Sequence, residues 1–214
     1  MIWTSAAGPL PSRYPFATVA SYFHYNPRWV ARATRRLISA TRGQRPAWQL
    51  LQIFHYPVTR THPTPAEFRH SAYSAVVHGA NGIGLWSSDL KAGRAREDIR
   101  GLLANRKLWQ EVKRVIRAVR RLSPVITSEG LIEKPAACDN EHLAVLNKRW
   151  NSHLYVWLLN MRAAPETALL RLPVQRGKLI NEIRPGGEFT FRNGQCELPL
   201  EPLQPMVLRV QPAS

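Results

Sequence analysis

The first half of the chain alternates short apolar runs with amphipathic segments of helical period. Apolar runs at Val19–Phe23, Trp48–Phe54 and Ile83–Trp86 predict three strands, and the second is apolar almost throughout, as a covered parallel strand should be. The spacing between them predicts helices from Pro27 to about Ala40 and from Pro65 to His78. This alternation predicts βα units and a parallel sheet.

The second predicted helix has a clear start and stop. Thr64-Pro65-Ala66-Glu67 has the pattern of a capping box, with proline at the first helical position. Gly79 suits the left-handed residue that ends a helix, and His78 lies in the last turn before it. These assignments give Glu67 and His78 structural roles.

A change of pattern follows a third amphipathic helix, predicted at Leu108–Leu122. Ser123-Pro124 marks the change, and the strands after it are short, alternating and separated by turns. The candidate strands are residues 142–149, 153–159, 168–172, 178–183, 188–191, 196–200 and 206–210. The first two flank Trp150-Asn151-Ser152, which predicts a hairpin. Their pattern predicts an antiparallel β-sandwich. We expect two domains, residues 1–126 and residues 127–214.

The composition and the net charge raise the question of an anionic ligand. The 214 residues are 44% hydrophobic and carry a formal net charge of +16, which makes a polyanion a reasonable first thought. The basic residues are spread over solvated helix faces, however, and no nucleic-acid-binding motif is present. We therefore do not expect a nucleic-acid ligand.

No apolar run has the length of a membrane helix, and the N-terminus lacks a signal-peptide pattern, so we expect no membrane association. Localisation stays open.

The cysteines and histidines indicate no cofactor. Cys138 and Cys196 lack metal-ligand spacing, and either one disulfide or two free thiols fits the sequence. Histidine–carboxylate spacing for a metal is absent, and the glycines around Gly82 open no helix that could hold a phosphate. We expect neither a metal nor a cofactor.

Three blocks of the sequence resemble the last βα units of (β/α)8-barrel glycoside hydrolases and their uncharacterised relatives. The matching residues are Pro46, Trp48, Leu51, Gln52, Phe54, Pro63, Thr64, Glu67, Arg69, His78, Gly79, Ala80, Gly82 and Trp86. Residues 21–27, Ser-Tyr-Phe-His-Tyr-Asn-Pro, resemble strand six of these barrels. The C-terminal part is similar to the sandwich domain that often follows them. The resemblance implies an α/β plus all-β chain: about the last three βα units of a (β/α)8 barrel, followed by the sandwich.

The same resemblance implies an incomplete catalytic apparatus. Glycoside hydrolysis normally needs two carboxylates that flank the scissile bond. In the resembled hydrolases the acid/base comes from strand four, which this chain lacks, and the nucleophile lies at the end of strand seven. Gln52 stands nearest to that position, and an amide is a poor nucleophile; Glu67 is the single carboxylate before Asp89. The catalytic residues therefore stay unassigned, and we expect this chain alone to be inactive, whatever the parent protein does.

Five residues at or near the predicted strand ends are candidates for binding sugar. In the resembled barrels an aromatic ring at the end of strand eight stacks on a sugar, as Trp86 would, and Gln52 could hydrogen-bond a hydroxyl group. Tyr22 and His24 could line the same mouth, and Asp89 could hold a hydroxyl group. The structural alternatives are a core tryptophan, a satisfied core amide and a loop cap or solvated charge at Asp89.

We interpret the sequence as the C-terminal fragment of a carbohydrate-active, glycoside-hydrolase-like protein. It would contribute part of a sugar cleft, and its partners would be a carbohydrate and the missing N-terminal half of the barrel. The alternative is a non-enzymatic basic module that binds a polyanion or a partner protein. The sugar, the linkage, the stereochemical outcome and the oligomeric state cannot be inferred from the sequence.

Overall fold

A computed structural model describes residues 17–21, 28–42, 44–53, 63–86, 105–129 and 132–213, with the backbone alone at 17–21 and 86. The chain divides into two compact units, Met1–Val115 and Ile116–Ser214. The division falls inside helix α4 (Arg106–Ile126). The domain boundary after residue 126 stays a prediction.

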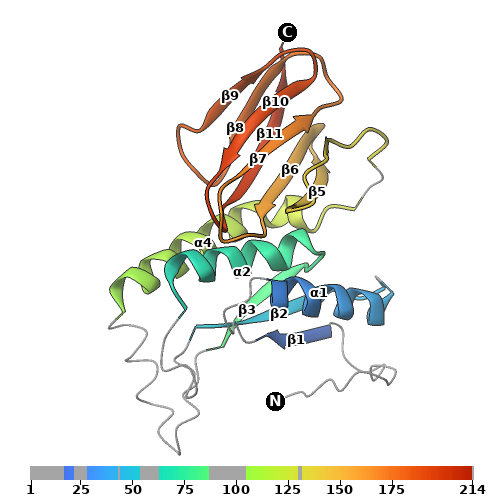
Figure 1. The fold of residues 1–214 in the computed structure, drawn as a ribbon. Coiled ribbons are helices and arrows are strands. Elements are labelled where there is room, and N and C mark those ends of the chain that lie inside the picture. The colour runs from blue at the N-terminus through green and yellow to red at the C-terminus, as the bar shows by residue number, and fades with distance from the viewer. Residues whose placement is uncertain are drawn as a thin grey trace, which may run out of the picture. The chain divides into compact units, whose positions relative to one another are not determined.

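The first unit contains a three-stranded parallel sheet in the order β1-β2-β3. Its strands are β1 (Ala17–Ser21), β2 (Ala47–Gln52) and β3 (Gly82–Trp86). Helix α1 (Arg28–Thr41) connects β1 to β2, and helix α2 (Pro65–Val77) connects β2 to β3. The predicted alternation of strands and helices is confirmed, although β1 begins and ends two residues before the predicted strand. Figure 1 shows α1 and α2 on the same side of this sheet.

The two faces of β2 have different surroundings. Ala47 packs with Leu37 and Ile38 of α1, and the buried Thr34 hydroxyl donates a 2.9 Å hydrogen bond to Oε1 of Gln49. Residues 47, 49 and 51 are therefore on the helix-covered face, since alternate residues of a strand share a face. Residues 48, 50 and 52 are on the opposite face.

Helix α2 begins and ends as the sequence predicts. The Thr64 side chain accepts a hydrogen bond from the Glu67 backbone N–H, and Glu67 Oε2 accepts one from the Thr64 N–H at 2.7 Å. Gly79 follows the helix with a φ of 102°, a conformation that favours glycine. The expected capping box is thus confirmed, and it occupies the Glu67 carboxylate.

Arg69 of α2 and two residues of α4 form a charged cluster in the first unit. The Glu111 carboxylate is buried, 3.3 Å from Nε of Arg69 and 2.7 Å from Nη1 of Arg114. A buried carboxylate requires such counter-charges because its desolvation is costly. Arg69, one of the residues that carries the family resemblance, therefore connects α2 to α4.

Helix α4 is longer than the sequence predicts. It was expected to end at Leu122, before Ser123-Pro124, but it continues through Pro124 to Ile126. Proline has no N–H to donate to the carbonyl four residues earlier, here that of Arg120. The Ser123 hydroxyl donates to that carbonyl at 2.9 Å instead. The Arg120 carbonyl thus keeps a hydrogen-bond donor where the helix passes through Pro124.

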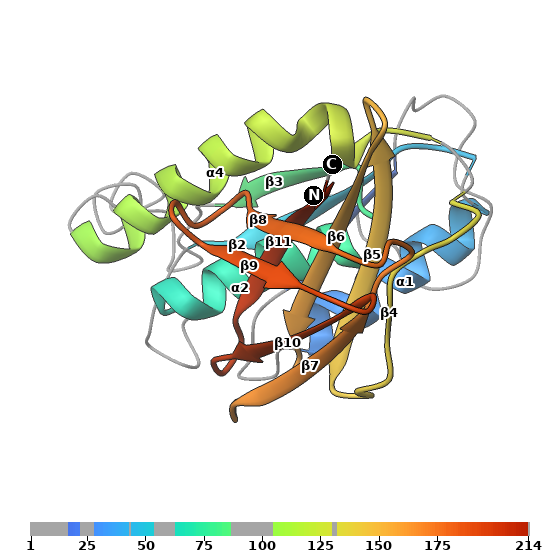
Figure 2. The same ribbon diagram turned by 90° about the horizontal axis from the view of Figure 1, so that it is seen from above.

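The second unit contains an antiparallel β-sandwich (Figure 2). One sheet has the order β10-β7-β4, and the other has the order β5-β6-β11-β8-β9. The strands are β4 (Ala137–Cys138), β5 (Leu143–Trp150), β6 (His153–Asn160), β7 (Glu166–Arg171), β8 (Gly177–Asn181), β9 (Glu188–Phe191), β10 (Gln195–Leu200) and β11 (Pro205–Pro212). Seven of these were predicted within a few residues; the two-residue β4 was not.

The core of the sandwich comes from alternate residues of both sheets. Leu154, Val156 and Leu158 of β6 face Leu170 and Leu198 of the other sheet across one buried cluster. The predicted hairpin is confirmed, with Asn151 and Ser152 as its turn and both at positive φ. Such a turn matches the right-handed twist of the paired strands.

The two cysteines lie on opposite sides of the same residue. Cys138 of β4 and Cys196 of β10 are both paired with Leu170 of β7, the strand between them. Two strand spacings are about 9.6 Å, which exceeds the Cα separation of about 7 Å that a disulfide can span. Both thiols are free, which decides between the two alternatives that the sequence left open.

Candidate functional site

The parallel strands place their C-terminal ends at one edge of the sheet. Gln52, the last residue of β2, is paired with Trp86, the last residue of β3. Ser21, the last residue of β1, is paired with Leu51. Active sites of (β/α)8 barrels form at this edge. The register therefore brings the backbones of two candidate binding residues, Gln52 and Trp86, next to each other.

Gln52 lies on the face of the sheet opposite α1 and α2. It shares the period-two face of Trp48 and Leu50, whereas its neighbour Leu51 is 1% exposed on the helix-covered side. The Gln52 side chain is buried at 8% exposure. An amide in this position belongs to the face that a closed barrel would turn inward.

Two glycines of β3 make room for large side chains of β2. A Cβ atom on Gly82 would lie 2.9 Å from Cε2 of Trp48, and one on Gly84 would overlap Cδ2 of Leu50. Trp48 leans over Gly82 and remains 42% exposed. Trp48 was not among the predicted site residues, although its period-two spacing from Gln52 was visible in the sequence.

Three predicted site residues lie outside the described part of the chain. Tyr22 and His24 follow β1 in the sequence, and Asp89 follows β3. Trp86 is described by its backbone only. The roles of these four residues stay predictions.

His78 has a structural environment at the end of α2. Its Nδ1 lies 2.8 Å from the Ser74 carbonyl oxygen. Burial lowers the pKa of His78; the Ser74 hydrogen bond opposes this shift, and the nearby charge of Arg35 adds to it. The ring therefore favours its neutral form. In the last turn of a helix a charged ring would stabilise the helix dipole, but burial outweighs that effect at His78.

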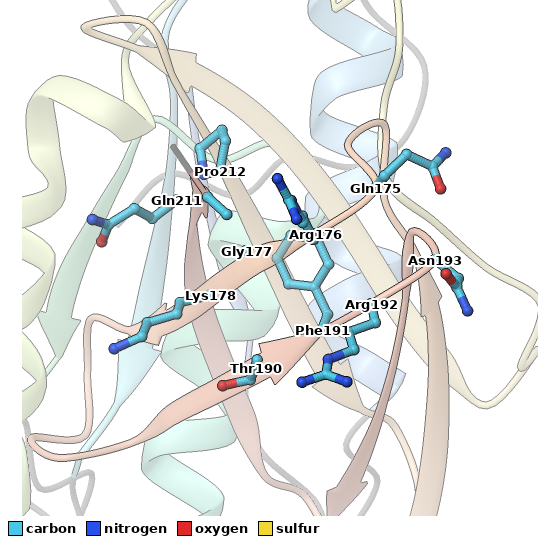
Figure 3. Close-up of a pocket in the computed structure, with 11 residues that line it drawn as sticks. Gln175, Arg176, Gly177, Lys178, Thr190, Phe191, Arg192, Asn193, Gln211 and Pro212 are labelled. Atoms are coloured by element: carbon cyan, nitrogen blue, oxygen red, sulfur yellow. The ribbon is translucent and has the colours of Figure 1, made fainter.

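A second concavity lies on the sandwich and was not anticipated from the sequence. Its volume is about 650 Å³, within the range of small-ligand sites. Figure 3 shows its lining residues around Phe191. They come from the start of β8 and the turn before it, from the end of β9 and the turn after it, and from the C-terminal end of β11. The sequence does indicate one turn of this region, because Asn193-Gly194 is a dipeptide typical of tight hairpin turns, and both residues have positive φ.

The described ranges contain no group of three or more His, Cys, Asp and Glu side chains that could hold a metal ion. Within those same ranges, no helix combines the length and the apolar character needed to cross a membrane.

The sequence matches no protein-family model, and a comparison with curated proteins finds no match. Solved structures are similar in fold. The α-amylase from Geobacillus thermoleovorans complexed with acarbose has a TM-score of 0.57 at 10% identity, over 93% of this chain and 54% of that protein. AmyP in complex with maltose has a TM-score of 0.57 at 15% identity, over 92% and 50%.

An α-amylase from Anoxybacillus, described as a new glycosyl hydrolase subclass, has a TM-score of 0.56 at 12% identity, over 93% and 53% of the two chains. The chain thus spans about half the length of these proteins. At such low identity the likeness concerns the fold alone. In its fold, this α/β and β-sandwich chain resembles part of a glycoside hydrolase.

Proposed function

We propose that this chain is the C-terminal part of a (β/α)8-barrel, carbohydrate-active protein and supplies one side of its sugar cleft. The observation that carries the proposal is the position of Gln52, at the C-terminal end of β2 on the face opposite the helices. A neutral amide there suits the hydroxyl groups of a sugar. The fold likeness to proteins solved with maltose and acarbose supports the same ligand class.

The cleft would combine this amide with residues that follow the other strands. Trp86 would supply an apolar ring for stacking, and Tyr22, His24 and Asp89 would supply further polar contacts. Parallel strands emerge at a common edge, so segments that follow β1 and β3 begin near Gln52. The remaining strands of the barrel would complete the cleft.

Binding of neutral oligosaccharides tests this assignment. Calorimetric titration with maltotriose and other neutral trisaccharides should detect binding that Gln52→Ala and Trp86→Ala each weaken by about tenfold. Trp150→Ala is the matched control, because Trp150 is a half-exposed tryptophan of the sandwich. Equal losses in all three variants would contradict the proposed cleft.

Catalysis by the chain alone is not part of the proposal, because a glycosidase needs two positioned carboxylates. In a screen of aryl glycosides we expect no turnover. Turnover that Asp89→Asn abolishes would show that the catalytic pair is present after all.

The alternative, a basic module for a polyanion, has a different salt dependence. Binding of a polyanion should weaken steeply between about 50 and 200 mM salt as counterions compete. Stacking and neutral hydrogen bonds should change little over the same range. The salt slope therefore separates the two functions.

A further inference from the structure

We propose that the concavity on the sandwich binds an acidic sugar, a carboxylated or sulfated oligosaccharide, through Arg176 and Arg192. For brevity we call it the sandwich concavity. Its lining residues are Gln175, Arg176, Gly177, Lys178, Thr190, Phe191, Arg192, Asn193, Gln211, Pro212 and Ala213. Its lining residues all belong to the second unit, whereas Gln52 belongs to the first, and the site would add a second ligand class.

All the charged residues that line the sandwich concavity are positively charged. Its lining contains three cations and no carboxylate. Lys178 is paired with Glu188 at 3.2 Å, but within the described ranges neither Arg176 nor Arg192 has an ion pair. Two exposed guanidinium groups in one hollow attract oxyanions, and their planar donors fit a carboxylate or a sulfate in a bidentate manner.

The neutral groups of the lining favour a sugar as the carrier of that oxyanion. Gln175, Asn193 and Gln211 present exposed amides, and Thr190 presents a hydroxyl group. Amides and hydroxyls donate to and accept from sugar hydroxyl groups. Phe191 is 2% exposed, so the lining has no exposed ring on which a nucleic-acid base could stack.

The backbone beneath the site is held in place by close packing. Lys178 pairs with Gln211 on one side and Thr190 on the other, so these three residues form one cross-strand row. Gly177 pairs with Pro212 and Phe191, and a Cβ atom there would lie 2.9 Å from Cζ of Phe191. The Asn193-Gly194 turn determines where Arg192 leaves the sheet. In Figure 3 the Phe191 ring lies between the Arg176 and Arg192 side chains. Lys178, Thr190 and Gln211 thus lie on paired strands, and Arg176 and Arg192 lie directly before β8 and directly after β9.

Calorimetric titration of the full chain tests the proposal. The probes are trigalacturonic acid as the carboxylated sugar, a heparin tetrasaccharide as the sulfated sugar, maltotriose as the neutral sugar, and inorganic sulfate. At least one acidic sugar should bind, and the preferred one identifies the oxyanion. Arg176→Ala and Arg192→Ala should each weaken that binding by about tenfold.

Arg184→Ala is the matched control, because Arg184 is an exposed arginine in the same unit outside the lining. It should weaken binding by less than about twofold, the effect of a distant screened charge. If either alanine variant loses its cooperative thermal transition, Arg176→Gln and Arg192→Gln remove the charge and keep most of the side-chain volume.

The proposal would be overturned if neither acidic sugar bound, or if Arg184→Ala weakened the binding as much as the two lining variants do. Tight binding of maltotriose at Arg176, or of inorganic sulfate as tightly as both acidic sugars, would also contradict it. So would a single-stranded oligonucleotide that displaced the acidic sugar at a lower concentration than a competing acidic sugar does. Gln52→Ala should leave the binding of acidic sugars unchanged, and Arg176→Ala should leave the binding of neutral sugars unchanged. Failure of one site is thus distinguishable from failure of the other.

Discussion

The hydroxyl group of Thr34 on α1 donates a buried 2.9 Å hydrogen bond to Oε1 of Gln49 on β2. Both side chains are fully buried. This contact couples the helix to one face of the strand and leaves the other face for Trp48 and Gln52. Thr34→Val, which keeps the shape and removes the donor, should lower the free energy of unfolding by about 1–3 kcal/mol, measured by urea denaturation.

Thr34→Ser is the control, because it keeps the hydroxyl group and removes only a methyl group. It should cost less than Thr34→Val. The reverse order would mean that packing rather than the hydrogen bond holds α1 on the sheet.

The compensation at Pro124 can be tested with a double-mutant cycle. Ser123→Ala should lower the free energy of unfolding by about 1 kcal/mol, because the Arg120 carbonyl loses its hydroxyl donor. In the Pro124→Ala background the same change should cost almost nothing, since an alanine at that position supplies the missing backbone N–H. Equal costs in the two backgrounds would show that the Ser123 hydroxyl does not replace the proline N–H.

His78 should make stability depend on pH. Its pKa is lowered in the folded state, mainly by burial, from the ordinary value of 6.5. Between the folded-state pKa and 6.5 the unfolded chain therefore binds more protons. The contribution of the neutral ring is complete above pH 6.5 and is lost as the pH falls toward the folded-state pKa. Urea denaturation across this range should give a smaller pH slope for His78→Gln than for the natural chain; equal slopes would assign the effect elsewhere.

The cysteines should stay reduced and react at different rates. Cys196 is 7% exposed, and burial raises the pKa of its thiol, whereas Cys138 is half-buried. A thiol reagent followed by mass spectrometry should modify Cys138 first, because the thiolate and its access control the rate. The mass deficit of an intramolecular disulfide in the folded, air-exposed protein would contradict the strand register.

The expected domain boundary can be tested by comparing two fragments. Arg121 donates a hydrogen bond to the Glu182 carbonyl oxygen in the second unit, so the last turns of α4 contribute to the sandwich. Residues 127–214 should unfold cooperatively, and residues 116–214 should do so at a higher temperature. A fragment 127–214 without a cooperative transition would rule out the boundary after residue 126.

Local sequence patterns predicted most of the fold. The capping box at Thr64 and Glu67 and the turn at Asn151-Ser152 follow from neighbouring residues, and both are present. The predicted end of α4 was wrong, because the helix continues through Pro124, where the Ser123 hydroxyl supplies the donor that proline lacks.

The candidate sites depend on contacts between distant segments, which a single sequence shows less well. The face of β2 that the helices leave uncovered follows from the contact of Thr34 with Gln49, 15 positions later. The sandwich concavity joins Arg176, Arg192 and Gln211 through the pairing of β8, β9 and β11. No local spacing connects these three residues.

The contact of Trp48 with Gly82 also constrains how the sequence can change over time. A Cβ atom at position 82 would lie 2.9 Å from the Trp48 ring, so the ring would have to shift to admit a side chain there. A replacement of Gly82 should therefore be tolerated better after a smaller residue has appeared at position 48. Substitutions in this part of the sheet should thus occur in an order, with position 48 of β2 changing before position 82 of β3. A laboratory selection that randomises both positions should recover large residues at one of them but not at both.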